Sequence, residues 1–184
     1  MAQTFREELK IATRDALLNK TAAEDRVFTM RSLPRRSPQT PNILIFTTDE
    51  RAQGYGPHGP PSFRRVLTLS VEADIQANTD AELDTAVDQM IADVETALLR
   101  NPEWATRHED VEGIRTVVEH GSLDADTRHA GVTMQFDIAH RTVHEPLIED
   151  DLETVEVDVE PEGADEDAAF DPGVTFEFET SEDE

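Results

Sequence analysis

Two segments of the chain place apolar residues at helical spacing. Residues 5–16 do so at intervals of four, three and four positions, and residues 83–98 at intervals of four, four, three and four. A T-x-x-E capping box precedes each run, beginning at Thr4 and at Thr79, and supplies hydrogen-bond partners to the first turn of a helix. The pattern predicts two amphipathic helices, the first ending near Asn19 and the second at the Asn-Pro pair that follows it.

Five further segments have the pattern of β-strands. Between Leu67 and Gln76 every odd position is apolar and every even position is polar, which is typical of a strand with one buried face. The segments 113–121 and 131–140 are separated by a short polar turn and are expected to form an antiparallel pair. Residues 42–48 form a continuous apolar run, which indicates a strand buried on both faces. A shorter candidate strand covers residues 26–30.

The expected order is helix, three strands, helix and two strands. We predict an α/β domain of the α+β type over residues 1–144, with a small mixed or antiparallel sheet that carries both helices on one face. The Pro-rich stretch 32–41 connects the first two strands, and residues 50–61 are expected to form a long loop. The remaining residues, 145–184, are expected to form an acidic C-terminal arm.

The charge of the chain is large and unevenly distributed. It has 41 Asp and Glu against 16 Lys and Arg, a net charge of −25. Residues 145–184 hold 18 of the acids and none of the bases, so residues 1–144 have a net charge of only −7. Such a field repels nucleic acid and anionic membranes, so a basic partner or a saline medium fits it better. Fourteen of the bases are Arg, which suits a halophilic protein, although a GC-rich genome alone would also exchange Lys for Arg.

The composition also excludes several classes of site. The chain has no Cys, so disulfides, thiolate metal sites and Cys nucleophiles are ruled out. No apolar run approaches the ~20 residues needed to cross a bilayer. The first ten residues lack the apolar core of a signal peptide, and we therefore expect the protein to stay inside the cell that makes it, without a membrane contact.

Residues 71–90 carry six acidic side chains and no basic one. Two of them, Glu72 and Asp74, lie on the polar face of the predicted strand. The other four fall at or near the N-terminus of the second helix, where its dipole favours anions by ~0.3–1 kcal/mol each: Asp80, Glu82, Asp84 and Asp88. We interpret the stretch as a solvated face, with a catalytic or metal-binding cluster as the alternative.

Two motifs match patterns of known binding sites, but neither has the neighbouring residues that such a site needs. GYGPHG, at residues 54–59, matches G-x-G-x-x-G, but prolines and a strand follow it where phosphate binding needs a helix N-terminus. His140, His144 and Glu145 lie at a strand exit without a recognised metal-ligand spacing. The sequence shows neither a calcium loop nor a nucleophile with its base and orienting group. We therefore expect no catalytic, cofactor-binding or metal-binding residues, and a protein that is not an enzyme.

The acidic arm contains two alternating stretches, LETVEVDVE and VTFEFET. Repulsion between its acids favours disorder, yet the alternation gives strand periodicity with one apolar face, which includes Val157, Phe176 and Phe178. We hypothesise that this face adds as a strand to a sheet edge of the same or a neighbouring subunit.

The chain resembles the tail terminator proteins of long-tailed bacteriophages and related archaeal viruses in four successive segments: REELKIATRDALLN, PNILIFTTDE, FRRVLTLSVEADIQANTDAELDTAVDQMIADVETALL and GIRTVVEHGSLDADTRHAGVTMQFDIAH. The resemblance covers roughly residues 3–142. Its sharpest part is the unit in which an R-x-L-x-L-x-V-E strand runs into T-D-x-E-L-D. The chain departs from the smaller members in its acidic arm and in the loop at residues 54–61.

The resemblance implies a structural virion protein without catalysis. In the family, small α/β subunits form a ring, expected to be a hexamer, on the head-proximal end of the tail tube. The ring stops tube polymerisation and joins the tail to the head. The implied partners are further copies of the chain, the tail tube protein and the head–tail connector protein, in a virion assembled in the host cytoplasm. The acidic charge predicts that DNA passes through the lumen without specific binding.

The family supplies no catalytic residues to carry over, so candidate subunit or tube contacts come from the sequence itself. The densest basic groups are Arg35, Arg36, Arg64 and Arg65, which could receive acids of a neighbouring subunit or could be solvated charges. Tyr55 and His58 in the loop, and the three apolar arm residues, complete the set.

Other functions stay open as alternatives. Another neck or tail-completion protein of similar fold would share these patterns. An acidic adaptor that occupies basic protein surfaces would use the arm as its active part. A metal-dependent enzyme would use the region from Asp80 to Asp88.

Overall fold

The computed structural model describes residues 4–29, 40–56, 60–122 and 127–145. The chain divides into two units, Met1–His144 and Glu145–Glu184, and the fold described here is that of the first.

Both predicted helices are present. Helix α1 spans Phe5–Leu17 and α2 spans Asp80–Leu99. The hydroxyl of Thr4 accepts a hydrogen bond from the Glu7 amide at 3.4 Å, and that of Thr79 accepts one from the Glu82 amide at 3.2 Å. The capping boxes therefore begin the helices as predicted. A short helix, α3 (Pro102–Ala105), was not predicted, and the Asn101 side chain caps it.

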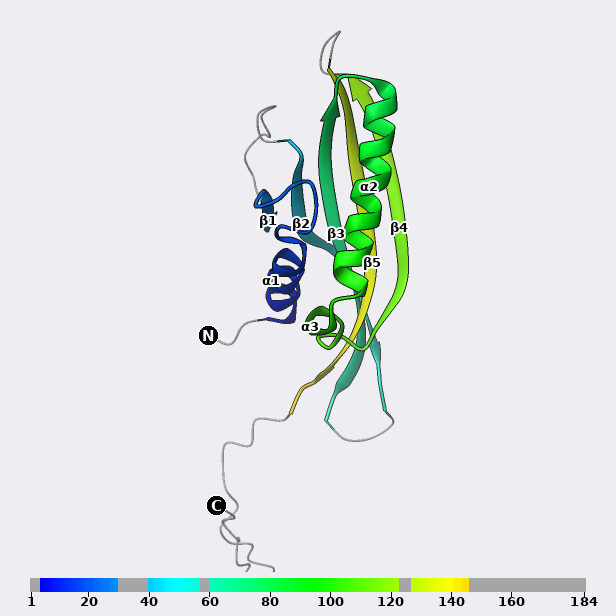
Figure 1. Ribbon diagram of the computed structural model, residues 1–184. Coiled ribbons are helices and arrows are strands. Elements are labelled where there is room, and N and C mark those ends of the chain that lie inside the picture. Colours follow the sequence, from blue (N-terminus) through cyan, green and yellow to red (C-terminus); the bar gives the residue numbers. More distant parts are fainter. Residues whose placement is uncertain (1–3, 30–39, 57–59, 123–126, 146–184) are drawn as a thin grey trace, which may run out of the picture. The chain divides into compact units, whose positions relative to one another are not determined.

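Five strands form one mixed sheet in the order β1-β2-β3-β5-β4 (Figure 1). Strand β1 pairs with β2 in parallel, and every other neighbouring pair is antiparallel. This confirms the predicted α+β fold and its order of elements. The bounds of the strands are β1 Val27–Thr29, β2 Asn42–Gly54, β3 Ser62–Ala77, β4 Asp110–Ser122 and β5 Arg128–Val143.

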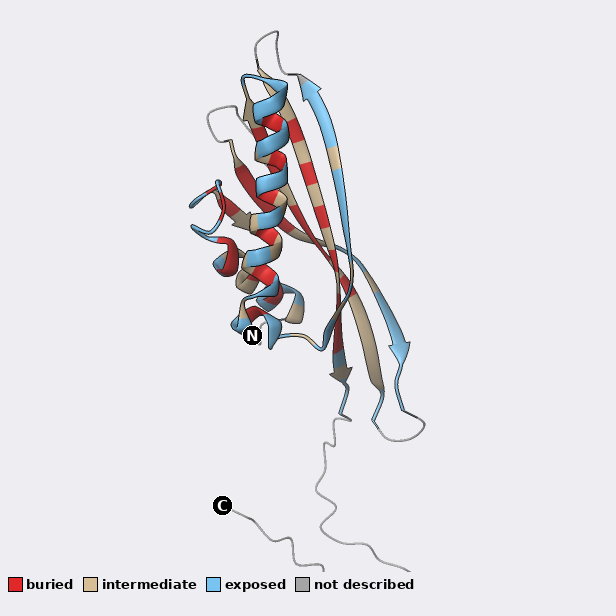
Figure 2. Ribbon diagram, turned by 45° about the vertical axis from the view of Figure 1, so that its right-hand side comes forward, coloured by how far each residue is buried: buried red, intermediate tan, exposed pale blue. Residues whose placement is uncertain are grey.

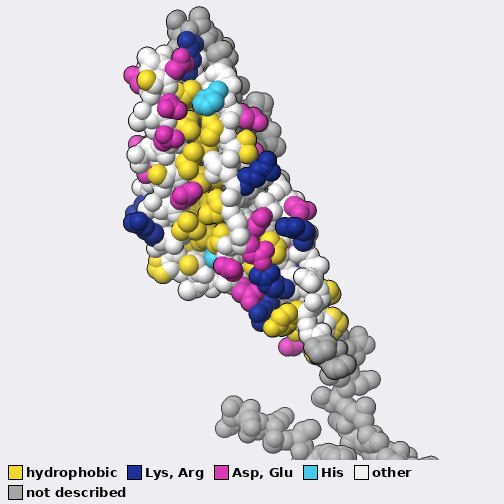
Figure 3. Space-filling view, turned by 90° about the vertical axis from the view of Figure 1, so that its right-hand side faces the viewer, with side chains coloured by type: hydrophobic (Ala, Val, Ile, Leu, Met, Phe, Trp, Pro, Cys, Tyr) yellow, Lys and Arg dark blue, Asp and Glu magenta, His cyan; other side chains and the backbone are white. Residues whose placement is uncertain are grey.

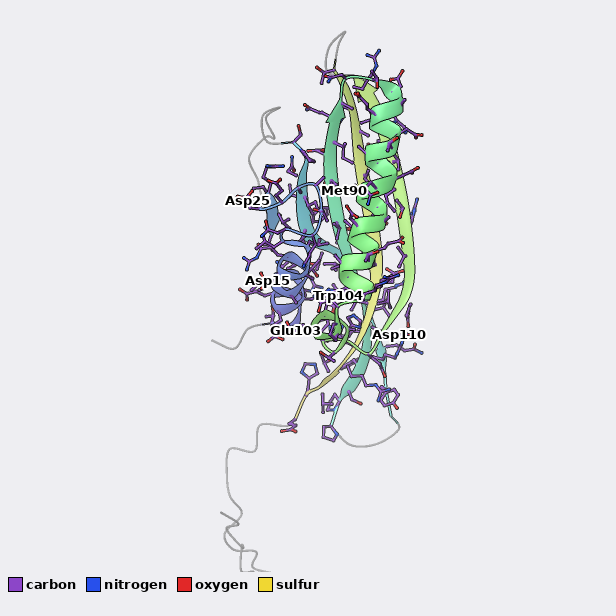
Figure 4. All side chains as sticks on the ribbon, viewed as in Figure 1. Asp15, Asp25, Met90, Glu103, Trp104 and Asp110 are labelled. Carbon is purple, nitrogen blue, oxygen red and sulfur yellow. The ribbon has the colours of Figure 1, made fainter. Side chains whose placement is uncertain are left out.

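A single hydrophobic core lies between the sheet and the two long helices (Figure 2). Ile43 and Ile45 of β2 lie opposite Ala73 and Val71 of β3, so the buried residues of neighbouring strands share one face. Trp104 of α3 is buried beside α1 (Figure 4). Alternating residues of β3 and β5 thus bury the apolar face of α2, as the periodicity predicted, while α1 packs on β1 and β2.

Two sequence expectations are wrong. Residues 50–61 are not one long loop, because β2 continues to Gly54 and β3 begins at Ser62. Beyond Glu50, residues 51–54 of β2 are exposed on both faces, so they have no apolar alternation that would predict a strand.

Asp74 is not on a solvated face either, because only 9% of it is exposed. Its partner across the β3–β5 ladder is Gly131, which has no side chain. His129, two positions away on the same face of β5, approaches instead and brings its Nε2 within 3.5 Å of the Asp74 carboxylate.

Candidate interaction surface

Three strands continue beyond the helical layer as a narrow extension, which we call the ribbon. It comprises residues 50–56 of β2 and its turn, 60–66 at the start of β3, and 139–144 at the end of β5. The 16 residues of β3 extend about 50 Å, whereas the 20 residues of α2, which run back along the sheet, cover about 30 Å. The ribbon therefore projects on the order of 20 Å past α2, on the side of α3 (Figure 1).

Arginines collect on the outer face of the ribbon. Arg64 and Arg141 lie directly opposite each other on β3 and β5, and both point away from the face that carries Leu67 of the core. Two like charges in such a pair repel each other. Carboxylates offset this repulsion: Arg64 pairs with Glu112 and, at 3.4 Å, with Glu109, while Arg141 also pairs with Glu109. The hydrogen bond that Arg64 donates to the Glu112 carboxylate raises the pKa of the Arg64 guanidinium.

Aromatic and apolar side chains accompany these arginines. The guanidinium of Arg141 lies 4.4 Å from the centroid of the Tyr55 ring, a cation–π distance. Tyr55 is 50% exposed and Val143 is 60% exposed. Arg51, also exposed, has no ion pair within the described residues. The outer face thus combines cations with accessible apolar area, a composition that is enriched at protein interfaces.

The inner face of the ribbon is fastened to α1 through a cluster around Glu50. The Glu50 carboxylate pairs with Arg6 of α1, with Arg65 at 3.6 Å and with His140 Nε2 at 3.7 Å. The His140 ring stacks on Phe5 with centroids 3.7 Å apart. Arg65 also donates to the Thr142 hydroxyl at 2.9 Å. These contacts hold the root of the ribbon at a defined angle to the helix.

The cluster shifts two pKa values. Burial alone would raise the pKa of Glu50, but the Arg6 hydrogen bond and the charges of Arg6, Arg65 and His140 hold it below the ordinary value. Burial lowers the pKa of His140, against the attraction of Glu50. At neutral pH, Glu50 is therefore the ionised centre of the cluster and His140 is neutral.

A second surface runs between α2 and the edge strand β4 (Figure 3). We call the residues Ile91, Ile114 and Val118 the apolar stripe. Ile114 is 42% exposed, and the other two are half-buried against the core. The inner face of β4 is only partly covered because α2 packs on β3 and β5 rather than on β4.

Acids border this stripe on the α2 side. Asp84, Asp88 and Glu95, which we call the acidic rim, share a flank of the helix with Ile91 through spacings of three and four residues. Asp84 lines a shallow depression together with His120 of β4, which places this flank next to that strand. From Asp80 to Leu99 the helix carries six acids and no base.

The structure brings some predicted contact residues together and leaves others outside its range. Tyr55, Arg64 and Arg65 all lie in the ribbon, although Arg64 and Arg65 face opposite sides of it. Arg35, Arg36, His58, Val157, Phe176 and Phe178 lie outside the described residues. Sequence reasoning missed Arg51 and Arg141, because isolated arginines in polar strands give no signal until the register aligns them.

The histidines and acids that the sequence offered as alternative metal or catalytic sites are also among the described residues. His140 stacks on Phe5, and the rings of His144 and Phe63 make an edge-to-face contact with their centroids 5.9 Å apart. Asp80 pairs with Arg128 at 2.8 Å, while Asp84 and Asp88 are exposed. Within the described ranges, no group of three or more His, Asp or Glu side chains is arranged to hold a metal ion. No helix in this part of the chain is long and apolar enough to cross a membrane.

The surface therefore consists of an arginine-bearing ribbon of the sheet, an apolar stripe between α2 and β4, and an acidic rim on α2. Comparison with known proteins adds no family to this description, because neither a protein-family model nor a curated protein matches the chain.

Proposed function

We propose that the chain is a structural subunit of a viral tail. Its copies form a ring that caps the head-proximal end of the tail tube, stops tube polymerisation and joins the tail to the head connector. The observation that carries this proposal is the open edge of β4, which lies beside the exposed apolar stripe.

An edge of this kind favours assembly. Strand β4 has 13 residues, and among the described strands it pairs with β5 alone, so its other side presents backbone groups that no described strand pairs. Monomeric proteins usually blunt such an edge, whereas here Ile114 and Val117 are exposed on it. Head-to-tail contacts that close into a ring would cover the edge in every copy.

The resemblance in sequence supports the same function. The segments that resemble tail terminator proteins form α1, β2, the β3–α2 unit and the β4–β5 pair, which together make up most of the sheet and both long helices. A net charge of −25 also suits a channel through which DNA passes without adhering, because negative surfaces repel the phosphate backbone.

Co-expression with the tube-forming protein of the same genome tests the proposal. Electron microscopy in low and high salt should show tubes of limited length, each with a ring at one end. Tubes of unrestricted length without a bound ring, in both salts, would exclude the terminator function. A ring found at another position in the neck would identify a different tail-completion protein.

An acidic adaptor is the second candidate, favoured by the 18 acids and absence of bases in residues 145–184. Deletion of these residues separates the two functions. An adaptor would lose its partner, because the deleted segment carries the charge that binds a basic surface. A terminator would retain its ring and its effect on tube length.

A further inference from the structure

We infer that the ribbon of one copy docks on the apolar stripe and acidic rim of the next copy, and that this contact joins the subunits of the ring. The inference rests on the proposed function and names the surfaces that the assembly uses.

The two surfaces are complementary in charge. The outer face of the ribbon carries Arg51, Arg64 and Arg141, of which the last two share the carboxylates of Glu109 and Glu112. Helix α2 carries a net charge of −6. In a chain with 41 acids and 16 bases, a face that gathers three arginines, with Arg51 outside any described ion pair, is a preferred partner for an acidic helix face.

The surfaces are complementary in apolar character as well. Tyr55 and Val143 expose apolar area among the arginines of the ribbon. In the apolar stripe, Ile114 exposes apolar area, while Ile91 and Val118 are partly covered. The contact would place Tyr55 and its surrounding arginines on the apolar stripe, next to the acidic rim. Aromatic residues and arginines of this kind are typical of the centre of a protein interface.

The contact has to form between copies. The ribbon belongs to the same twisted sheet as β4, and it leaves the sheet at the end opposite the N-terminus of α2. The Glu50 cluster fixes its root to α1. A ribbon that projects roughly 20 Å past α2 cannot fold back onto the rim of its own chain without breaking the β3–β5 ladder.

A contact between two different surfaces is heterologous, so repetition generates a ring or a filament rather than a closed pair. Every copy then offers one ribbon and accepts another. This arrangement allows a charge-exchange experiment with two variants of the full-length chain.

The ribbon variant is Arg51→Glu with Arg141→Glu, and the rim variant is Asp84→Lys with Asp88→Lys. Each alone places like charges at every subunit contact and should weaken self-association about tenfold or more. A mixture of the two should assemble again, because each altered surface then meets its complement in an alternating ring. Light scattering coupled to size exclusion, with and without tube ends, measures the assembly.

The matched control for the rim variant is Asp15→Lys with Asp25→Lys, which makes the same charge change at two exposed positions away from α2 and β4 and should leave assembly unchanged (Figure 4). A thermal melt of each variant checks folding. A second test, Ile114→Ser, removes apolar area from the stripe without reversing charge and should also weaken assembly.

Each outcome separates the interface from the proposed function. Rings that form normally from either reversed variant would overturn the interface and leave the capping function intact. Rings that respond as expected but do not limit tube length would retain the interface and end the terminator proposal. Loss of tube capping with unchanged self-association would overturn the interface and indicate that the apolar stripe and acidic rim receive the tube or connector protein. Wild-type protein that never self-associates, with or without tube ends, would also overturn it.

Discussion

At the scale of single residues, one hydroxyl group links two helices inside the core. Thr13 of α1 is fully buried and donates to the Leu9 carbonyl at 2.7 Å. The same oxygen accepts a hydrogen bond from the indole N–H of Trp104 at 2.9 Å. The short helix α3 is therefore held to α1 by a polar contact as well as by the packing of the indole ring.

Replacing Thr13 with Val keeps the shape of the side chain and removes the acceptor. The buried indole N–H then has lost its partner, which should lower the free energy of unfolding by about 1–3 kcal/mol. Urea unfolding followed by the fluorescence of Trp104, the single tryptophan, measures the change. Thr13→Ser keeps the hydroxyl and loses only the methyl group, so it serves as the control that retains the hydrogen bond. A Thr13→Val protein as stable as the wild type would contradict the role of the hydroxyl.

At the scale of elements, the cluster around Glu50 joins α1 to the root of the ribbon. It makes that junction sensitive to pH. Because burial lowers the pKa of His140 in the folded protein, the unfolded chain takes up a proton first as the pH falls below the ordinary value of 6.5. The resulting loss of stability begins near that pH. The pKa of Glu50 is also lowered, so its stabilising contribution is complete above the ordinary 4.5 and disappears only in more acidic solution.

The variant His140→Phe tests this junction, since a phenyl ring retains the stacking on Phe5 and does not titrate. Between pH 7.5 and 5.5 the wild-type protein should lose stability relative to the variant. The measurement is the free energy of unfolding at several pH values. His120→Gln, an exposed site on β4, is the control and should follow the wild-type slope. Parallel curves for wild type and His140→Phe would contradict the role of the buried imidazole.

The elements also show which features the sequence could predict. The capping residues Thr4 and Thr79 predicted the start of both helices, and the alternation from Leu67 to Gln76 predicted a half-buried strand. Burial on one face produces a regular spacing of apolar residues in the sequence. The ribbon lacks such a period, since residues 51–54 of β2 are exposed on both faces. Predicting the arginine face required the strand register, which places Arg64 opposite Arg141 across 77 positions of sequence.

At the scale of the whole molecule, the dominant quantity is the net charge of −25. Charges of one sign repel one another more strongly in a compact state than in an extended one, so the excess destabilises the fold. Added salt shortens the screening length from about 10 Å at 0.1 M to about 3 Å at 1 M. The ion pairs of Glu50 and Arg64 are local and few compared with the excess of acids over bases in the chain, so screening should on balance favour the folded chain.

The melting temperature should therefore rise between 0.1 M and 1 M sodium chloride, measured at a protein concentration where the oligomeric state stays constant. The variant Asp84→Asn, Asp88→Asn and Glu95→Gln removes three exposed or half-exposed acids beyond the first turn of α2 and should show a shallower rise. A melting temperature that falls with salt would mean that the ion pairs outweigh the repulsion. That result would also remove the main physical reason for expecting a saline environment, because an acid surplus that needs no screening gives the folded chain no advantage there.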